Sequence, residues 1–141
     1  MSRNISHNIS AALGLRLPFN AGSGLTYDAA DPDNHLHKPV KISADRTVVL
    51  CADNDTPIGS IVLVEPSDRV STKVTVEMGP VVRFNLGTGV TASTLINKRV
   101  VADGAGGVKL AGAGAVGFGV VTAVENGVVF VLANGTVVPN S

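Results

Sequence analysis

The stretch VGFGVVTAVENGVVFVLANG, residues 116–135, decides the fold, because it encodes a β-hairpin with a defined turn. Asn126-Gly127 is typical of a two-residue type I′ turn, in which both central residues need positive φ. The turn fixes the strand register, because each residue before it then faces one residue after it. The predicted pairs are Glu125–Val128, Val124–Val129, Ala123–Phe130, Thr122–Val131 and Val121–Leu132.

Both faces of this hairpin are apolar, whereas a surface hairpin of a water-soluble protein alternates apolar with polar residues. Burying one aliphatic side chain contributes about 1.5–3 kcal/mol, so four valines left in water would forfeit a large part of a domain's stability. The second face is therefore covered, either by the same chain or by a neighbouring subunit. The scarcity of charges after residue 79 favours a subunit. The predicted oligomer-interface residues are Val120, Val124, Val129 and Val131, whose face also carries Thr122 and Ala133. The other face carries Val121, Ala123, Val128, Phe130 and Leu132.

Composition extends the β prediction to the rest of the chain. Of 16 glycines, 12 lie from Gly79 onward, in a region dominated by valine. Short apolar runs spaced by glycine, asparagine and aspartate turns favour strands over helices. We therefore expect an all-β fold, a small β-barrel or sandwich.

The clearest alternation in the chain runs from Val70 to Leu86. Valines and Met78 occupy one parity, and polar residues such as Lys73 and Glu77 occupy the other, which predicts a strand with one polar face. Gly79-Pro80 interrupts the pattern, and a proline cannot donate to a central ladder. We predict one long strand with a kink or bulge at this dipeptide.

Residues 1–37 show no sustained period of 2 or 3.6 and are predicted to form an extended N-terminal arm, with a β-barrel-like domain at residues 38–141. The apolar side chains of this segment occur singly, which suits docking into pockets on another surface. The alternative is a partly disordered tail. The candidate docking residues are Leu15, Leu17, Phe19, Leu25 and Tyr27.

Residues capable of chemistry form no convincing constellation. Cys51, the one cysteine, lies in the apolar run RTVVLCAD and is predicted to be a buried structural thiol. His35 and His37 lack a third metal ligand and are predicted to be solvated loop residues. The aspartates of DAADPDN, residues 28–34, lack the spacing of a calcium loop. No nucleophile elbow or P-loop occurs, so we expect no enzyme, no cofactor and no metal site.

Charge and targeting signals restrict the partners. The formal net charge is zero, which predicts no steering towards nucleic acid or an anionic membrane and fits a protein that works in an assembly. A single cysteine excludes an intrachain disulfide and suggests synthesis in a reducing compartment. The first ten residues lack the apolar core of a signal peptide, and no apolar run reaches the length of a membrane helix.

A family resemblance gives these features a context. KPVKISADRTVVLCADNDTPIGSIVLVE, the alternating strand and LINKRVVADGAGGVKLAGAGAVGFGVVTAVENGVVFVLANG together resemble the capsid decoration, or cement, proteins of tailed phages. The matching positions are Ile58-Gly59, Val100 to Asp103, Gly107 to Lys109, and Val116-Gly117. The resemblance covers residues 38–135 and is a pattern of common residue types. It implies a β-barrel-like body, homo-oligomers (often trimers) and contacts that bridge major capsid protein subunits on the outside of the head.

The expected function is therefore that of a virion structural protein, made in the host cytoplasm, which binds the assembled head and stabilises the shell. Two alternatives stay open: a β-rich module of a tail or fibre assembly, and an oligomeric binding scaffold that is not viral. A small β-barrel enzyme or ligand-binding protein would need a pocket with convergent polar groups, which the sequence does not indicate.

Overall fold

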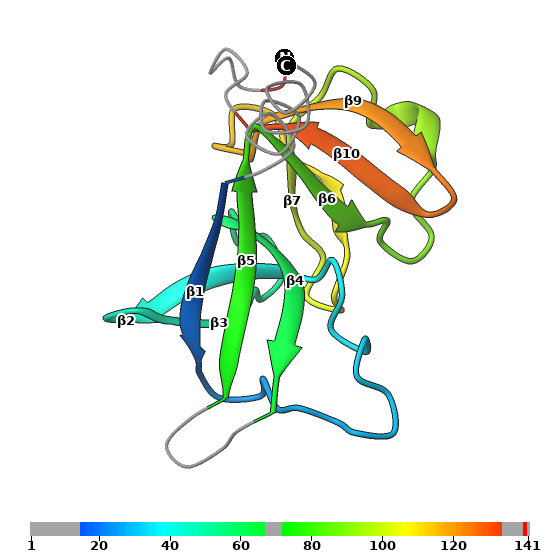
Figure 1. Cartoon of the computed structure of the whole chain (residues 1–141). Helices are drawn as coiled ribbons and strands as arrows, with labels where there is room; N and C mark the ends of the chain where they lie inside the picture. The colour runs from blue at the N-terminus through cyan, green and yellow to red at the C-terminus, as the bar shows by residue number, and fades with distance from the viewer. Residues whose placement is uncertain (1–14, 67–71, 134–139, 141) are drawn as a thin grey trace, which may run out of the picture.

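The computed structural model describes residues 15–66, 72–133 and 140, and this part of the chain is all-β, as predicted (Figure 1). A single turn of 3-10 helix, Ala92–Thr94, lies between the sixth and seventh strands. The strands are β1 (Leu15–Ala21), β2 (Pro39–Ala44), β3 (Thr47–Leu50), β4 (Gly59–Glu65), β5 (Lys73–Gly79), β6 (Val81–Asn85), β7 (Val100–Ala102), β8 (Val108–Leu110), β9 (Val120–Glu125) and β10 (Val128–Leu132).

Five strands close a small barrel in the order β1-β3-β2-β4-β5. Strand β5 pairs antiparallel with both β1 and β4. Strand β3 pairs parallel with β1 and antiparallel with β2. The barrel encloses one hydrophobic core, formed by Leu25, Val40, Val48, Ile61, Val64, Val74 and Val76.

The chain leaves the barrel at Gly79-Pro80, so the predicted interruption there is confirmed, but the predicted single long strand is wrong, because two strands in different sheets flank it. Strand β5 ends at Gly79, and β6 starts at Val81 and begins a second sheet with the order β6-β10-β9 (Figure 1). The peptide bond of Gly79-Pro80 is cis. The paired strands β7 and β8 complete a second core, formed by Val82, Phe84, Leu95, Val100, Val108, Val121, Val129 and Val131. Val70 and Ser71, where we predicted the alternating strand to begin, lie outside the described residues.

The predicted boundary after residue 37 is wrong for the described residues, because residues 15–37 are part of the barrel. Strand β1 pairs with β5 from Leu15 opposite Gly79 to Asn20 opposite Lys73. Leu25 is buried in the barrel core, with Phe19 and Tyr27 packed against it. These side chains fill their own chain's core and are not free to dock elsewhere. Residues 1–14 of the predicted arm lie outside the described residues.

Proline at position 18 lies within strand β1. Within β1, the backbone N–H of Asn20 donates to the carbonyl of Arg46, on the β3 side, whereas that of Ala21 donates to Thr72 on the β5 side. Since strand residues alternate in direction, the nitrogen of Pro18 points the same way as that of Asn20, away from β5. The missing N–H therefore costs the β1–β5 ladder no hydrogen bond, which is how a proline is tolerated in a strand.

The hairpin of β9 and β10 has the predicted turn but a different register beyond it. Asn126 and Gly127 both have positive φ, 52° and 76°, as a type I′ turn requires. The pairs from Glu125–Val128 to Ala123–Phe130 form as predicted. Beyond them the register shifts, so that Val131 faces Val121 in place of Thr122. One extra residue on β9, a β-bulge, turns Val121 to the face that carries Val129 and Val131.

The prediction that Val129 and Val131 form an oligomer interface is therefore wrong. Both are fully buried in the second core of their own chain, and Val124 packs against the same core. Only Val120, which pairs with Leu132, lies on the opposite face. The second face of the hairpin is covered from within the chain, because Leu95 and the β7–β8 pair pack against it.

Candidate interaction surface

The outer face of the three-stranded sheet carries six apolar side chains among nine. Antiparallel partners point to the same side of a sheet, so the register places one set of β6, β9 and β10 side chains together. None of these side chains is buried. The outer face consists of Val81, Arg83, Asn85, Val120, Ala123, Glu125, Val128, Phe130 and Leu132.

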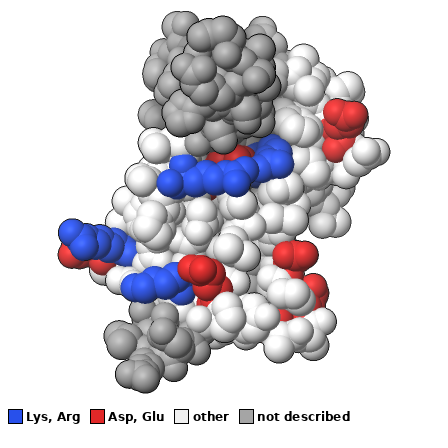
Figure 2. Space-filling view, in the orientation of Figure 1, with Lys and Arg blue, Asp and Glu red and all other residues white. Residues whose placement is uncertain are grey.

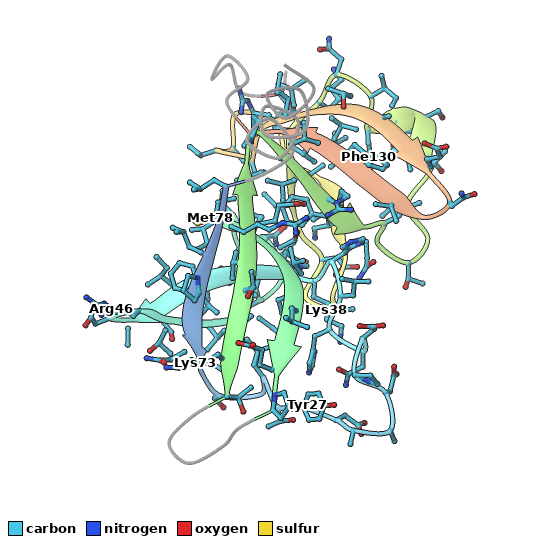
Figure 3. All side chains as sticks on the ribbon, in the orientation of Figure 1. Tyr27, Lys38, Arg46, Lys73, Met78 and Phe130 are labelled. Carbon is cyan, nitrogen blue, oxygen red and sulfur yellow. The ribbon has the colours of Figure 1, made fainter. Side chains whose placement is uncertain are left out.

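Apolar groups dominate the outer face, and Figure 3 shows Phe130 on β10 within this sheet. Leu132 is 38% exposed, although it is a large aliphatic residue. On β1, Leu15 is 56% exposed and lies opposite Gly79, immediately before the chain enters this sheet. A contiguous group of exposed apolar side chains is typical of a protein–protein contact, whereas single ones are ordinary.

A buried carboxylate lies where the barrel meets the outer face. Glu77 on β5 is only 1% exposed, although it occupies the polar parity of its strand. Its Oε1 accepts hydrogen bonds from the backbone N–H of Arg83, at 3.3 Å, and from Nε of Arg83, at 3.2 Å. Its Oε2 accepts from Nη2 of Arg83, at 3.1 Å, and from Nη2 of Arg16, at 3.4 Å.

The strand arrangement explains this cluster. Arg16 on β1 lies directly opposite Glu77 in the register, so both side chains project from the same side of the barrel wall. Arg83 comes from β6, which follows β5 after the turn at Gly79-Pro80. One carboxylate therefore joins β1, β5 and β6, and it links the barrel to the second sheet.

His37 lies beside this cluster, and the charges of the cluster affect its pKa. Burial lowers the pKa of His37 below its ordinary value, the positive charge of Arg83 lowers the pKa further, and Glu77 acts in the opposite direction. The backbone of His37 also connects the two sheets: its N–H donates to Ile61 on β4, and its carbonyl accepts from Asn85 on β6. The imidazole is therefore neutral near pH 7 and adds no charge to the cluster.

A hollow of about 170 Å³ opens next to the buried carboxylate. Its lining residues are Arg16, Val81, Arg83 and Phe130, and we call it the Arg16–Arg83 hollow. Two guanidinium groups thus share a single carboxylate at the edge of an apolar face. In the view of Figure 2, most of the molecular surface carries no charged side chain.

A second hollow, of about 240 Å³, lies at the other end of β1. Its lining residues are Pro18, Phe19, Asn20, Arg46 and Lys73. Figure 3 shows Arg46 at the tip of the β2–β3 hairpin and Lys73 at the start of β5. Nζ of Lys73 donates to Oδ1 of Asn20, so this cation already has a partner within the hollow.

The predicted docking residues separate into two groups. Leu15 and Leu17 are exposed, at 56% and 40%, and remain available for contact with another molecule. Phe19, Leu25 and Tyr27 belong to the barrel core. The sequence signal for Glu77 was weak, because an acidic residue on the polar parity of a strand is ordinarily solvated. Arg83, six residues later and across the Gly-Pro kink, is the one hint that its charge is compensated.

The residues considered for chemistry are not assembled into a site. Cys51 is buried, as predicted, and burial raises the pKa of its thiol to about 12. His35 is buried, not solvated, and its Nδ1 lies 3.3 Å from Nζ of Lys38. Within residues 15–66, 72–133 and 140, no three histidine, cysteine or acidic side chains come together as metal ligands. The described residues also contain no helix long and apolar enough to cross a membrane.

Comparisons with models of protein families and with curated proteins found no match to this chain.

Proposed function

We propose that this chain is a capsid decoration protein, which binds the outside of an assembled phage head and bridges its major capsid subunits. The observation that supports the proposal is the apolar outer face of β6, β10 and β9, on a body whose two cores are already complete. Such a body has no need of further apolar burial to fold. Its exposed apolar side chains are then available for binding another protein surface.

The arrangement suits a protein that stabilises a shell. The strands that carry the outer face are braced by the second core beneath them, so the face is presented on regular structure and little order is lost on binding. A protein that binds the assembled shell and not its separated subunits stabilises the shell by mass action, by about 2.7 kcal/mol per site at 100 times the Kd. Self-association into an oligomer, for which the family resemblance suggests a trimer, would multiply weak contacts through effective concentration.

A binding experiment tests the proposal. Purified protein is mixed with expanded heads that lack it, from the phage whose genome encodes it, and bound protein is measured by co-sedimentation. We expect saturable binding at hundreds of copies per head and a higher melting temperature of the heads. Absence of both effects would remove the proposal, and saturation at a few copies would instead indicate a tail or fibre component.

A matched pair of variants locates the contact. Phe130→Asp places a charge at a half-buried side chain of the outer face, whereas Leu63→Asp places one at an exposed aliphatic side chain on β4 of the barrel. We expect the Phe130 variant to lose head binding and the Leu63 variant to retain it, with circular dichroism confirming that both are folded. Equal binding by both variants would exclude the outer face as the contact.

A further inference from the structure

We propose that the Arg16–Arg83 hollow binds the carboxylate of an aspartate or glutamate side chain on the protein surface against which the outer face docks. The inference rests on the proposed function only for the identity of that protein. The site itself is argued from the charge, shape and hydrogen-bonding capacity of the hollow.

The charges around the hollow do not balance. Arg16 and Arg83 carry two positive charges, and among the described residues Glu77 is the one acidic group with which either forms an ion pair. The neutral His37 contributes none. A net positive charge therefore remains at the edge of an apolar face, where removal of water on docking would make it costly unless an anion joined it.

The guanidinium groups also have donors to spare. Each guanidinium carries five N–H donors in a planar fork. Glu77 receives hydrogen bonds from Nε and Nη2 of Arg83 and from Nη2 of Arg16. The side chains of Arg16 and Arg83 are 47% and 34% exposed, so their remaining donors are accessible. A second carboxylate can thus be bound by two arginines that Glu77 already holds in position, an arrangement that favours strong charge-assisted hydrogen bonds.

The walls of the hollow favour a carboxylate side chain over a phosphate. Val81 and Phe130 are apolar and line the same space as the two arginines. An aspartate or glutamate matches this combination, because it carries its charge on an aliphatic stem. A nucleic acid would present a run of phosphates, which needs an extended basic surface. The chain has a formal net charge of zero, and the hollow holds only two arginines.

Arg16→Gln tests the site with little risk to the fold. Arg16 makes one hydrogen bond to Glu77, at 3.4 Å, and its side chain is half-exposed, so its loss leaves the Arg83–Glu77 contact intact. The matched control is Arg46→Gln, which removes the same charge at the exposed tip of the β2–β3 hairpin (Figure 3). We expect Arg16→Gln to weaken binding to undecorated heads about 10- to 100-fold, as for loss of a charged hydrogen bond. The Arg46 variant should bind as wild type does.

The possible results separate this inference from the proposed function. If the wild type binds heads and the two variants bind equally well, the hollow is not the carboxylate site and the inference is wrong. If the wild type does not bind heads, the proposed function fails, and a small-molecule titration decides the inference. In that titration N-acetyl-glutamate amide is added at constant ionic strength while NMR follows the Nε–H resonances of Arg16 and Arg83.

The titration can also contradict the proposal that the hollow binds a carboxylate. We expect saturable shifts of both arginine resonances with the glutamate derivative, none with sodium chloride, and none at Arg83 in the Arg16→Gln variant. Equal shifts with chloride, or no saturation, would overturn the proposal. Two further results would also overturn the proposal. In one, the wild type binds a labelled single-stranded oligonucleotide and Arg16→Gln abolishes this binding. In the other, the wild type self-associates in sedimentation equilibrium and Arg16→Gln abolishes this association. These last results would assign the hollow to a phosphate backbone or to a second copy of the chain.

Discussion

The guanidinium of Arg83 on β6 holds the carboxylate of Glu77 on β5 in a fork, 3.2 Å from Nε to Oε1 and 3.1 Å from Nη2 to Oε2. Glu77 is the only acidic residue that the described part of the chain buries. A buried carboxylate is tolerated when charged donors replace its water, and here both arginine side chains supply them. The barrel and the second sheet are thereby joined through an ion pair as well as through the chain at Gly79-Pro80.

Removing the carboxylate should therefore destabilise the whole body. We expect Glu77→Ala to lower the free energy of unfolding by about 3 kcal/mol, because it leaves Arg83 without its partner and opens a cavity beneath it. The control is Glu65→Ala on β4, an exposed acidic residue for which a change within about 0.5 kcal/mol is expected. Urea unfolding followed by circular dichroism measures both. Equal effects of the two substitutions would show that Glu77 does not couple the sheets.

The sequence predicted local features well and non-local ones poorly. The turn at Asn126-Gly127 and the break at Gly79-Pro80 were found because each depends on the conformational preference of two adjacent residues. The place of β1 in the barrel was missed, since it depends on pairing with β5, more than 50 residues later. No sustained alternation marks β1, and only the structure shows that the nitrogen of Pro18 points away from β5.

The hairpin shows how one extra residue changes the face on which neighbouring side chains lie. The turn alone implied a continuous register, in which Thr122 faces Val131. The pairing skips Thr122 and brings Val121 into the second core, a non-local arrangement that no local pattern encodes. Phe130 and Leu132 lie on the outer face because the residues between and beside them, Val129 and Val131, belong to the second core. Whether a partner covers that face stays a prediction.

Val131→Asp should unfold the chain and not merely dissociate an assembly. Val131 is fully buried beside Phe84 and Val121, so a carboxylate there would be desolvated without a partner. We expect a loss of several kcal/mol, which is a large part of the about 5–15 kcal/mol that stabilises a typical domain. Leu132→Asp, the next residue on the same strand but 38% exposed, is the control and should stay folded. A folded Val131 variant with altered sedimentation would restore the interface assignment.

Gly59 is required by a close approach of strands, not by a turn. A Cβ at this position would collide with the backbone carbonyl of Glu77 and lie 2.9 Å from Cγ1 of Val76. We expect Gly59→Ala to cost about 1–3 kcal/mol, since overpacking forces the backbone of β4 away from β5. Gly112→Ala is the matched control, because its Cβ would meet no atom within 4 Å. Thermal unfolding compares the two, and similar melting temperatures would show that β4 and β5 separate without cost.

Two histidines should make the free energy of unfolding depend on pH in the mildly acidic range. Burial lowers the pKa of His35, the charge of Lys38 lowers the pKa further, and a backbone hydrogen bond to Thr26 opposes both. Nζ of Lys38 lies 3.3 Å from Nδ1, so a protonated ring would place two cations side by side. The pKa of His37 is lowered as well, by burial and by Arg83.

As the pH falls, His35 and His37 should therefore become protonated at a higher pH in the unfolded chain than in the folded one. Both histidines have a pKa near 6.5 when unfolded and a lower pKa when folded, so the free energy of unfolding is constant above about pH 6.5 and falls as the pH decreases below it. Urea unfolding at pH 7.5, 6.5, 5.5 and 5.0 measures the fall. In His35→Gln one titrating group is gone, and the loss of stability between pH 7.5 and 5.0 should be smaller than in the wild type. A wild-type stability that does not change over this range would show that neither ring is held neutral by the fold.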